Sequence, residues 1–183
     1  MLAERPHNTT RDKAMQTTTG NGQQVPPQPG ADTAQRLIVN AQYIKDLSFE
    51  NPRAPQSLTQ QSSAPAVDIN VDVNAQNLSP DTYEVVLTVK ASATIGGEAL
   101  FLLELVYGAV VTVRNMPRDM LPPVLLVETP RLMFPFARNI VADATRDGGF
   151  PPLMINPIDF TELLRRNTAQ APDAPANDPT SAD

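Results

Sequence analysis

The sequence predicts an α+β protein in which helices pack on one face of a four-stranded antiparallel sheet. Strand-like segments lie between residues 36 and 113 of the 183 residues, and helix-like segments follow them. Residues 98–113 are apolar on both sides of a strand, because Leu102 alternates with Leu103 and Leu105. A chain of this length has few elements to cover two apolar faces, so we expect self-association, a partner surface or an apolar groove.

The two ends of the chain differ from its centre. Residues 1–35 are rich in Thr, Gln, Gly, Pro and Asn, and residues 167–183 contain no large apolar side chain. Such segments bury too little surface to offset the entropy lost on ordering. We therefore predict a disordered N-terminal extension at 1–35, a folded domain at 36–166 and a disordered acidic C-terminal tail at 167–183.

The strands are predicted in order along the first part of the domain. Residues 36–50 form the first, and their irregular apolar spacing is typical of a β-bulge. Residues 67–74 alternate Val or Ile with Asp or Asn, which is the clearest two-residue period in the chain. A turn at Asn77–Asp81 leads into a strand at 83–93, and Gly96-Gly97 then forms a tight hairpin.

The second part of the domain has helical spacing. Residues 117–130 hold four prolines and are predicted to be irregular. Residues 132–147 are predicted as a helix that ends at Gly148-Gly149, with one apolar side made by Phe136, Ile140, Val141 and Ala144.

Residues 151–157 are predicted to be an extended apolar linker. Asp159 and Glu162 then have the spacing of a capping box, which predicts a short final helix through Leu163 and Leu164.

Composition narrows the function classes. The formal net charge is −6, with acids in excess in both the domain and the tail, which argues against a nucleic-acid binder and favours a basic partner. The chain has no cysteine, so neither disulfides nor thiolate metal sites can form. Neither a secretory signal nor an apolar run of spanning length is visible, so we expect a cytoplasmic protein without membrane insertion.

The chain carries little that could perform catalysis. The single histidine, His7, lies in the extension that we predict to be disordered. Asp68 and Asp72 on one strand face could suggest a calcium ladder, but a solvated strand face is the simpler interpretation. No phosphate loop, nucleophile motif or metal-ligand cluster stands out. We therefore expect a protein that is not an enzyme and uses no cofactor or metal.

Several segments, taken in order, resemble the SecB family of protein-export chaperones. They are Tyr43–Pro55, Tyr83–Val89 with the Gly96-Gly97 hairpin, Leu132–Ile140 and Gly148–Phe160. The resemblance covers residues 38–165, and it identifies the domain at 36–166 as a SecB-like chaperone domain. It implies a homotetramer, built as a dimer of dimers, with helices sandwiched between two outer sheets. It also implies ATP-independent binding of unfolded precursor proteins in apolar grooves and their delivery to the SecA ATPase.

The resemblance also assigns residues to three surfaces. The acidic SecA-binding face corresponds to Asp46, Glu50, Leu102 and Glu104. The client groove corresponds to Val67, Ile69 and Val71, and the positions that affect the tetramer correspond to Leu103, Leu105 and Tyr107. Each set also has a plainer interpretation, namely a solvated sheet face for the first and intramolecular core for the other two.

Other functions remain open from the sequence. One alternative is a general or antitoxin-guarding holdase of the same fold, which would not need the acids that dock the motor. An enzyme is a further alternative, although no residues can be assigned to a reaction.

Overall fold

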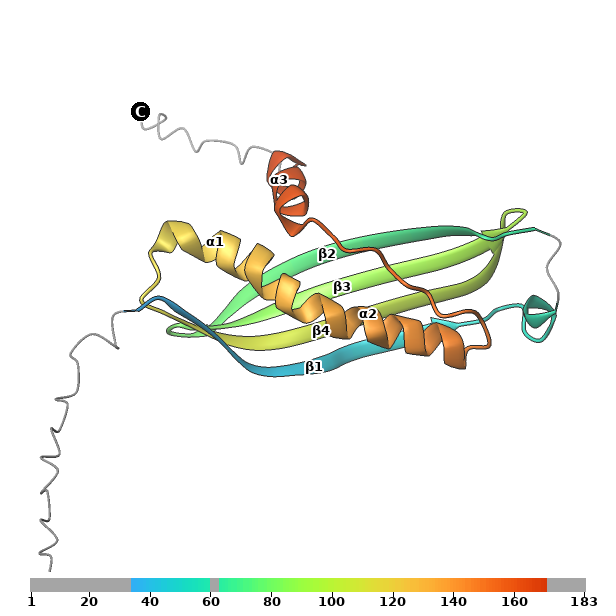
Figure 1. The fold of residues 1–183 in the computed structure, drawn as a ribbon, viewed down its shortest axis with the longest axis horizontal. Helices are drawn as coiled ribbons and strands as arrows, with labels where there is room; N and C mark the ends of the chain where they lie inside the picture. Colours follow the sequence, from blue (N-terminus) through green and yellow to red (C-terminus); the bar gives the residue numbers. More distant parts are fainter. Residues whose placement is uncertain (1–33, 60–62, 171–183) are drawn as a thin grey trace, which may run out of the picture. The chain divides into compact units, whose positions relative to one another are not determined.

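The computed structural model describes residues 34–59 and 63–170 (Figure 1). The N-terminal extension predicted to be disordered lies almost wholly outside these residues, as does the predicted tail beyond Gln170. The final helix includes residues 167–170, so the predicted boundary of the tail at residue 167 falls inside a helix.

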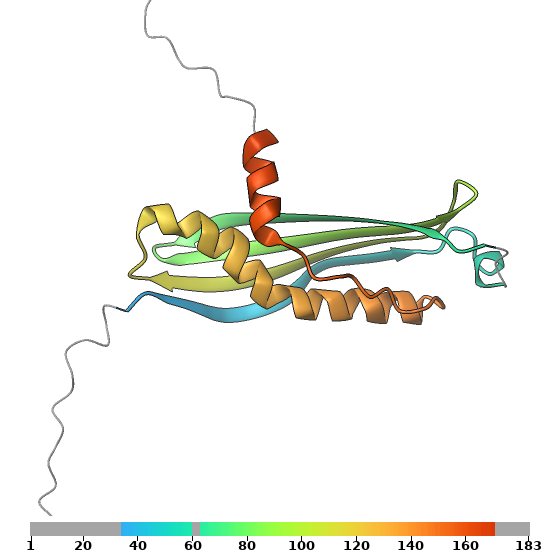
Figure 2. The same cartoon turned by 45° about the horizontal axis from the view of Figure 1, so that its top comes forward.

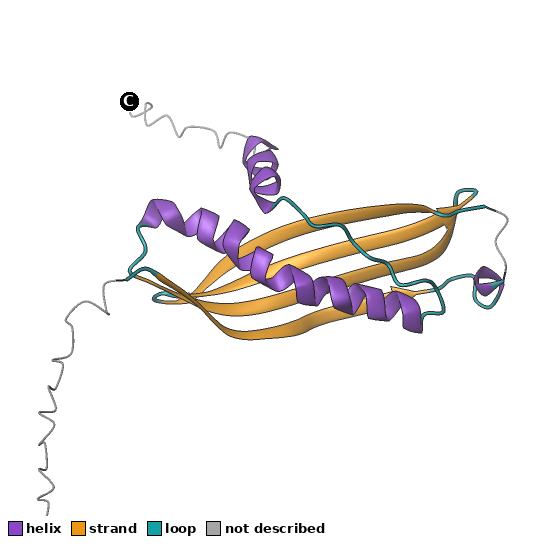
Figure 3. Ribbon diagram, viewed as in Figure 1, coloured by secondary structure: helices purple, strands orange, loops and turns teal. Residues whose placement is uncertain are grey.

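Four antiparallel strands form one sheet (Figure 3), and their order is β1-β4-β3-β2 (Figure 1). The strands are β1 (Arg36–Glu50), β2 (Ala66–Ser79), β3 (Thr82–Ile95) and β4 (Glu98–Arg114). Thus β1 and β2 are the two edges, and the chain passes between them through a segment with a short 3-10 turn at Gln56–Leu58. The predicted four-stranded antiparallel sheet is confirmed.

One of the two predicted turns between strands is confirmed, and the other begins later than predicted. Gly96 and Gly97 have φ angles of 60° and 84°, which glycine adopts without strain, and they form the predicted hairpin between β3 and β4. In contrast, β2 continues through Ser79, beyond the predicted start of the turn at Asn77. Asp81, with φ of 62°, makes the sharp change of direction.

A continuous run of helix occupies the segment that we expected to be irregular. It consists of α1 (Leu121–Pro123), a π-helical turn (Val124–Glu128) and α2 (Thr129–Asp147). The prediction for 117–130 was wrong because the prolines sit where a helix tolerates them. Two of them are in the first turn, where backbone N–H groups need no partner. Pro130 follows the π-helical turn, where the Thr129 hydroxyl donates to the Val124 carbonyl at 2.9 Å.

The helix α2 lies obliquely across one face of the sheet, which we call the inner face (Figure 2). Odd-numbered residues of β3 and β4 point to it and make the core with one side of α2. The fully buried members include Val85, Leu87, Val89, Leu105 and Val111 of the sheet, and Met133, Ala137 and Val141 of the helix. Phe136 was wrongly placed on this packed side, since 54% of it is exposed. The helix is apolar on more than one side, so spacing alone did not identify the packed one.

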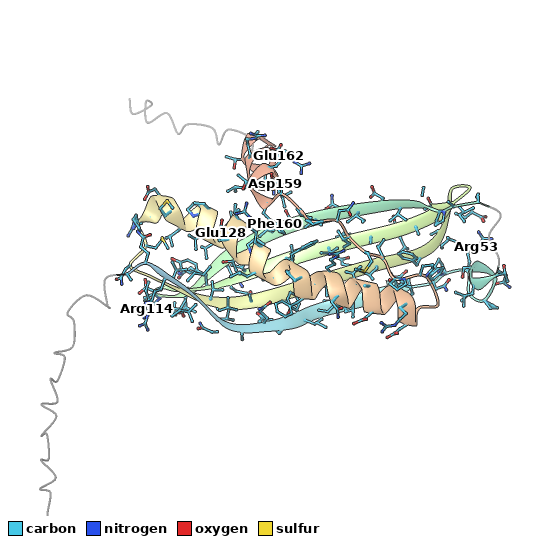
Figure 4. All side chains as sticks on the ribbon, in the orientation of Figure 1. Arg53, Arg114, Glu128, Asp159, Phe160 and Glu162 are labelled. Carbon is cyan, nitrogen blue, oxygen red and sulfur yellow. The ribbon has the colours of Figure 1, made fainter. Side chains whose placement is uncertain are left out.

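After Gly148 and Gly149 end α2 as predicted, the chain returns towards β2 and enters α3 (Phe160–Gln170). The Asp159 carboxylate caps α3 by accepting hydrogen bonds from the backbone N–H of Thr161 at 2.9 Å and of Glu162 at 3.1 Å. These bonds lower the pKa of Asp159, and the bond from the Glu162 N–H has the larger effect. Figure 4 shows Asp159, Phe160 and Glu162 together at the start of α3, where Phe160 is buried.

Candidate functional site

A groove of about 590 Å³ lies between the edge strand β2 and the segment that leads into α3. Its apolar lining is Ile69, Val71, Ile155, Ile158 and Leu163. Polar side chains border it, and Asn167 donates to the Asp72 carboxylate at 3.4 Å from one wall to the other. A segment of extended chain could therefore bury apolar side chains here while its backbone remained near polar groups.

The residues predicted to form the client groove share one face of β2. Ile69 and Val71 line the groove, and Val67 is on the same face with 46% of its surface exposed. The sequence did not identify the opposite wall, Ile155, Ile158 and Leu163. Ile155 lies in the predicted linker, Ile158 just after it and Leu163 in the predicted final helix. Nothing in the sequence indicated that this part of the chain would return to β2.

A second cavity, of about 460 Å³, lies on the other side of α3. It is lined by Val73 of β2, Leu126 of the π-helical turn and Leu164 of α3, among others. Leu163 contributes to both cavities, so α3 stands between them. The apolar surface along β2 is therefore longer than the predicted residues 67–71 indicated.

The face of the sheet away from α2, which we call the outer face, brings together the residues predicted to bind SecA. Glu50 pairs with Leu102 and Asp46 pairs with Val106 in the β1–β4 register, and Glu104 lies between these two pairs on β4. Leu102 is 42% exposed and lies in a shallow depression of about 290 Å³ with Glu50 and Glu104. The arrangement is an exposed apolar side chain surrounded by acids.

Lys90 of β3 also belongs to this surface, although the sequence did not indicate it. Its ammonium lies 3.1 Å from the Glu104 carboxylate, and the side chains of Lys90 and Glu104 are 59% and 39% exposed. The pairing of β3 with β4 places Lys90 directly opposite Glu104, which only the register could reveal. The Glu104 charge is therefore partly balanced within the chain.

The residues predicted to affect the tetramer are on the inner face. Leu103, Leu105 and Tyr107 are all buried within the single chain, and burial raises the pKa of the Tyr107 hydroxyl. These side chains belong to the core beneath α2, which agrees with their interpretation from the sequence as intramolecular core. By contrast, Leu132 and Phe136 on the uncovered side of α2 are about half exposed.

A polar cluster on the outer face joins side chains of β1, β2 and β3, and no pattern in the sequence indicated it. The Glu84 carboxylate is only 5% exposed and accepts hydrogen bonds from the Tyr43 hydroxyl and the Gln76 amide. Lys45 donates to both carboxylate oxygens, at 2.9 and 3.0 Å. The Tyr43 bond is the main cause that lowers the pKa of Glu84, and it raises the pKa of Tyr43 to about 12.

Similarity to known proteins identifies the family of this chain. A family model described as preprotein translocase subunit SecB matches residues 30–171. The chain belongs to the SecB family. The proteins of this family are chaperones for protein export, so this chain is a protein-export chaperone and not an enzyme.

Individual SecB proteins agree with this assignment. The chain is 52% identical over 150 residues to protein-export protein SecB of Rhodopseudomonas palustris strain BisB5, which covers 82% of this chain and 92% of the relative. It is 55% identical over 143 residues to that of Paramagnetospirillum magneticum strain AMB-1, covering 78% and 91% respectively.

A solved structure supports the fold. The SecB-like chaperone of Mycobacterium tuberculosis, determined in complex with a peptide from an antitoxin, matches with a TM-score of 0.57 and 12% identity. The match covers 67% of this chain and 91% of the other. Within the described part of this SecB-family chain, no helix is long and apolar enough to cross a membrane.

Proposed function

We propose that this SecB-family chaperone holds unfolded precursor proteins in the cytoplasm, without using ATP, and delivers them to SecA. The observation that carries the proposal is the groove between β2 and the segment before α3, which is apolar on both walls. Burial of apolar surface is non-directional and contributes about 25 cal/mol per Å², so such a groove discriminates little between sequences. Several weak contacts along one unfolded chain then combine into stable binding.

Delivery to SecA is proposed to use Asp46, Glu50, Leu102 and Glu104 on the outer face. Like charges around an exposed Leu102 favour a basic partner that also offers an apolar contact. Charges at the rim of an interface act mainly on the association rate and its salt dependence. Because this surface and the groove lie on opposite faces of the sheet, docking and client binding can be separated by mutation.

Assembly as a dimer of dimers is the third part of the proposal. Leu132 and Phe136 leave apolar surface on the side of α2 that does not contact the sheet. Such a surface is expected if helices of two dimers pack against each other. The buried residues Leu103, Leu105 and Tyr107 would then influence the tetramer by holding α2 in position, and not by touching another subunit. A native mass measurement at micromolar concentration tests this, and a monomer would contradict it.

The client groove is tested by changing Val67, Ile69 and Val71 together to Ala. We expect weaker binding of an unfolded precursor, with the circular dichroism spectrum preserved. The control changes Asp68 to Ala, because Asp68 alternates with the first set and lies in the depression on the outer face, away from the groove. Equal loss of client binding in both variants would show that the groove is not the binding site.

Motor docking is tested by the double change Asp46→Ala and Glu104→Ala. We expect SecA binding to weaken by about 1–3 kcal/mol, with a reduced salt dependence and near-normal client binding. The control removes two acids from the helical side, Asp119→Ala with Asp147→Ala, and should dock normally. A double variant that docks normally and responds normally to salt would show that the proposed face is wrong.

A general or antitoxin-guarding holdase is the alternative, and the fold match to a chaperone bound to an antitoxin peptide favours considering it. This alternative predicts intact client binding and no association with SecA. A SecA pull-down with the wild-type protein therefore separates the two functions.

A further inference from the structure

One extra residue in β1 determines which side chains reach the outer face. Ile44 pairs with Tyr107 and Asp46 pairs with the next residue, Val106, so Lys45 has no partner position of its own. This is a β-bulge, in which two residues of one strand oppose one residue of its neighbour. It confirms the bulge that the irregular apolar spacing predicted, and a second one lies between Val39 and Ala41.

The bulge at Lys45 reverses the alternation of side chains along β1. Before it, Tyr43 pairs with Gly108 and points to the outer face. In a regular strand Asp46 and Glu50 would then point to the inner face, because side chains alternate with a period of two. With the extra residue, Asp46 and Glu50 point outward, and Phe49 points inward to stack on Phe101 at a centroid distance of 5.6 Å.

The polar cluster attaches to β1 at the bulge and just before it. Lys45, the extra residue itself, forms the ion pair with Glu84 across β4. Two positions earlier, the Tyr43 ring passes over Gly108, where an added Cβ would lie 2.7 Å from the ring. Only a residue without a side chain allows this crossing. Glu84 is therefore bonded to residues on both sides of Ile44, and these bonds fix the strand where its alternation changes.

The downstream end of this stretch has a separate anchor. Phe49 packs against Gly148 so closely that an added Cβ there would lie 2.3 Å from its ring. It also joins Phe101 and Phe150 in an aromatic cluster on the inner face. The three residues from Asp46 to Ser48 thus lie between one anchor on the outer face and one on the inner face.

We propose that Lys45 and Glu84 are positioning residues for SecA docking, because they hold the bulge that turns Asp46 and Glu50 to the outer face. This rests on the proposed function of that face. Neither residue needs to touch SecA. Removing the Lys45 charge leaves the buried Glu84 carboxylate without a counter-charge, and neutralising Glu84 does the same to Lys45. Either change makes the bulged form of β1 less stable relative to a strand without the bulge.

The proposal is tested with Lys45→Met, which keeps the stem and removes the charge, and with Glu84→Gln, which keeps the shape of the side chain. We expect amide hydrogen exchange in residues 44–50 to become about tenfold faster, while exchange in β2 and β3 stays unchanged. SecA binding should fall about tenfold, and client binding should not change. Lys45→Arg, which retains the ion pair, should restore both exchange and docking.

The control is Lys90→Met, which removes a lysine from the same face without touching the bulge and should leave exchange in residues 44–50 unchanged. Unchanged exchange and docking in both Lys45→Met and Glu84→Gln would overturn the proposal. So would a rise in exchange that is equal in all four strands, since that indicates a general loss of stability. If the wild-type protein does not bind SecA, the proposed function fails, whereas the exchange experiment still decides whether these residues hold the bulge.

Discussion

The two faces of the single sheet are held together by different forces. On the inner face, residues such as Leu105 are buried under α2 by packing that has no preferred direction. Within residues 34–59 and 63–170, no helix covers the outer face, and Glu84 is instead shielded and held by directed bonds from Tyr43, Lys45 and Gln76. A polar cluster can thus order a sheet face that has no covering layer of helix.

The largest expected difference between the faces is in the cost of truncation. Leu105→Ala should lower the free energy of unfolding by about 2–5 kcal/mol, because the inner face cannot collapse around the cavity. Val106→Ala, one residue further along β4, should cost about 1 kcal/mol or less, since Val106 points to the uncovered face. Urea denaturation measures both. Similar losses would mean that the outer face is also packed, for instance by another subunit.

A side chain added at Gly108 would crowd the outer face beneath the Tyr43 ring. Gly108→Ala should cost about 1–3 kcal/mol in urea denaturation, because the new methyl group would meet the Tyr43 ring 2.7 Å away. Adding Tyr43→Ala should relieve this clash, so the two changes should cost less together than the sum of each alone. Additive costs would contradict the close approach of the ring to Gly108.

The polar cluster also makes a prediction about alkaline stability. The bond to Glu84 keeps the proton on Tyr43 and raises its pKa from 10.0 to about 12. The stabilisation is therefore complete below pH 10 and is lost as the pH rises towards 12. Tyr43→Phe should cost about 1–2 kcal/mol at neutral pH, and this difference from the wild type should shrink above pH 10. A difference that is the same at pH 7 and pH 11 would argue against the bond.

The smallest expected effect is at the exposed ion pair between Lys90 and Glu104. Lys90→Ala should change the free energy of unfolding by about 0–1 kcal/mol, because exposed pairs gain little in water. The same measurement in high salt should remove even this difference. A larger loss would show that the outer face depends on exposed charges as well as on the buried Glu84 cluster.

The sequence predicted those features that depend on neighbours along the chain. The alternation at 67–74, the glycine hairpin and the cap at Asp159 are all local, and all were confirmed. The π-helical turn was missed because prolines are read as breaks unless their position within a helix is known. The cluster around Glu84 could not be predicted, because it joins side chains of three strands and depends on a β1–β4 register that includes two bulges.

The candidate surfaces were predicted in part for the same reason. Strand parity correctly grouped Leu102 with Glu104 and separated them from Leu103, since a two-residue period needs only the local sequence. Parity did not show which group would be covered by α2. It also did not reveal the second wall of the groove at Ile155 and Ile158, because that contact depends on how the chain returns after α2.

The π-helical turn at Val124–Glu128 holds one residue more than a regular α-helical turn would. In a regular α-helix, one added residue rotates the following part of the helix by about 100°, and a wider π turn takes up that rotation. Deleting one residue from this turn should therefore restore a regular helix and leave Met133 and Ala137 against the sheet. One residue inserted between Met133 and Ala137, where the helix is regular, should instead turn one of them away from the sheet and be far more damaging.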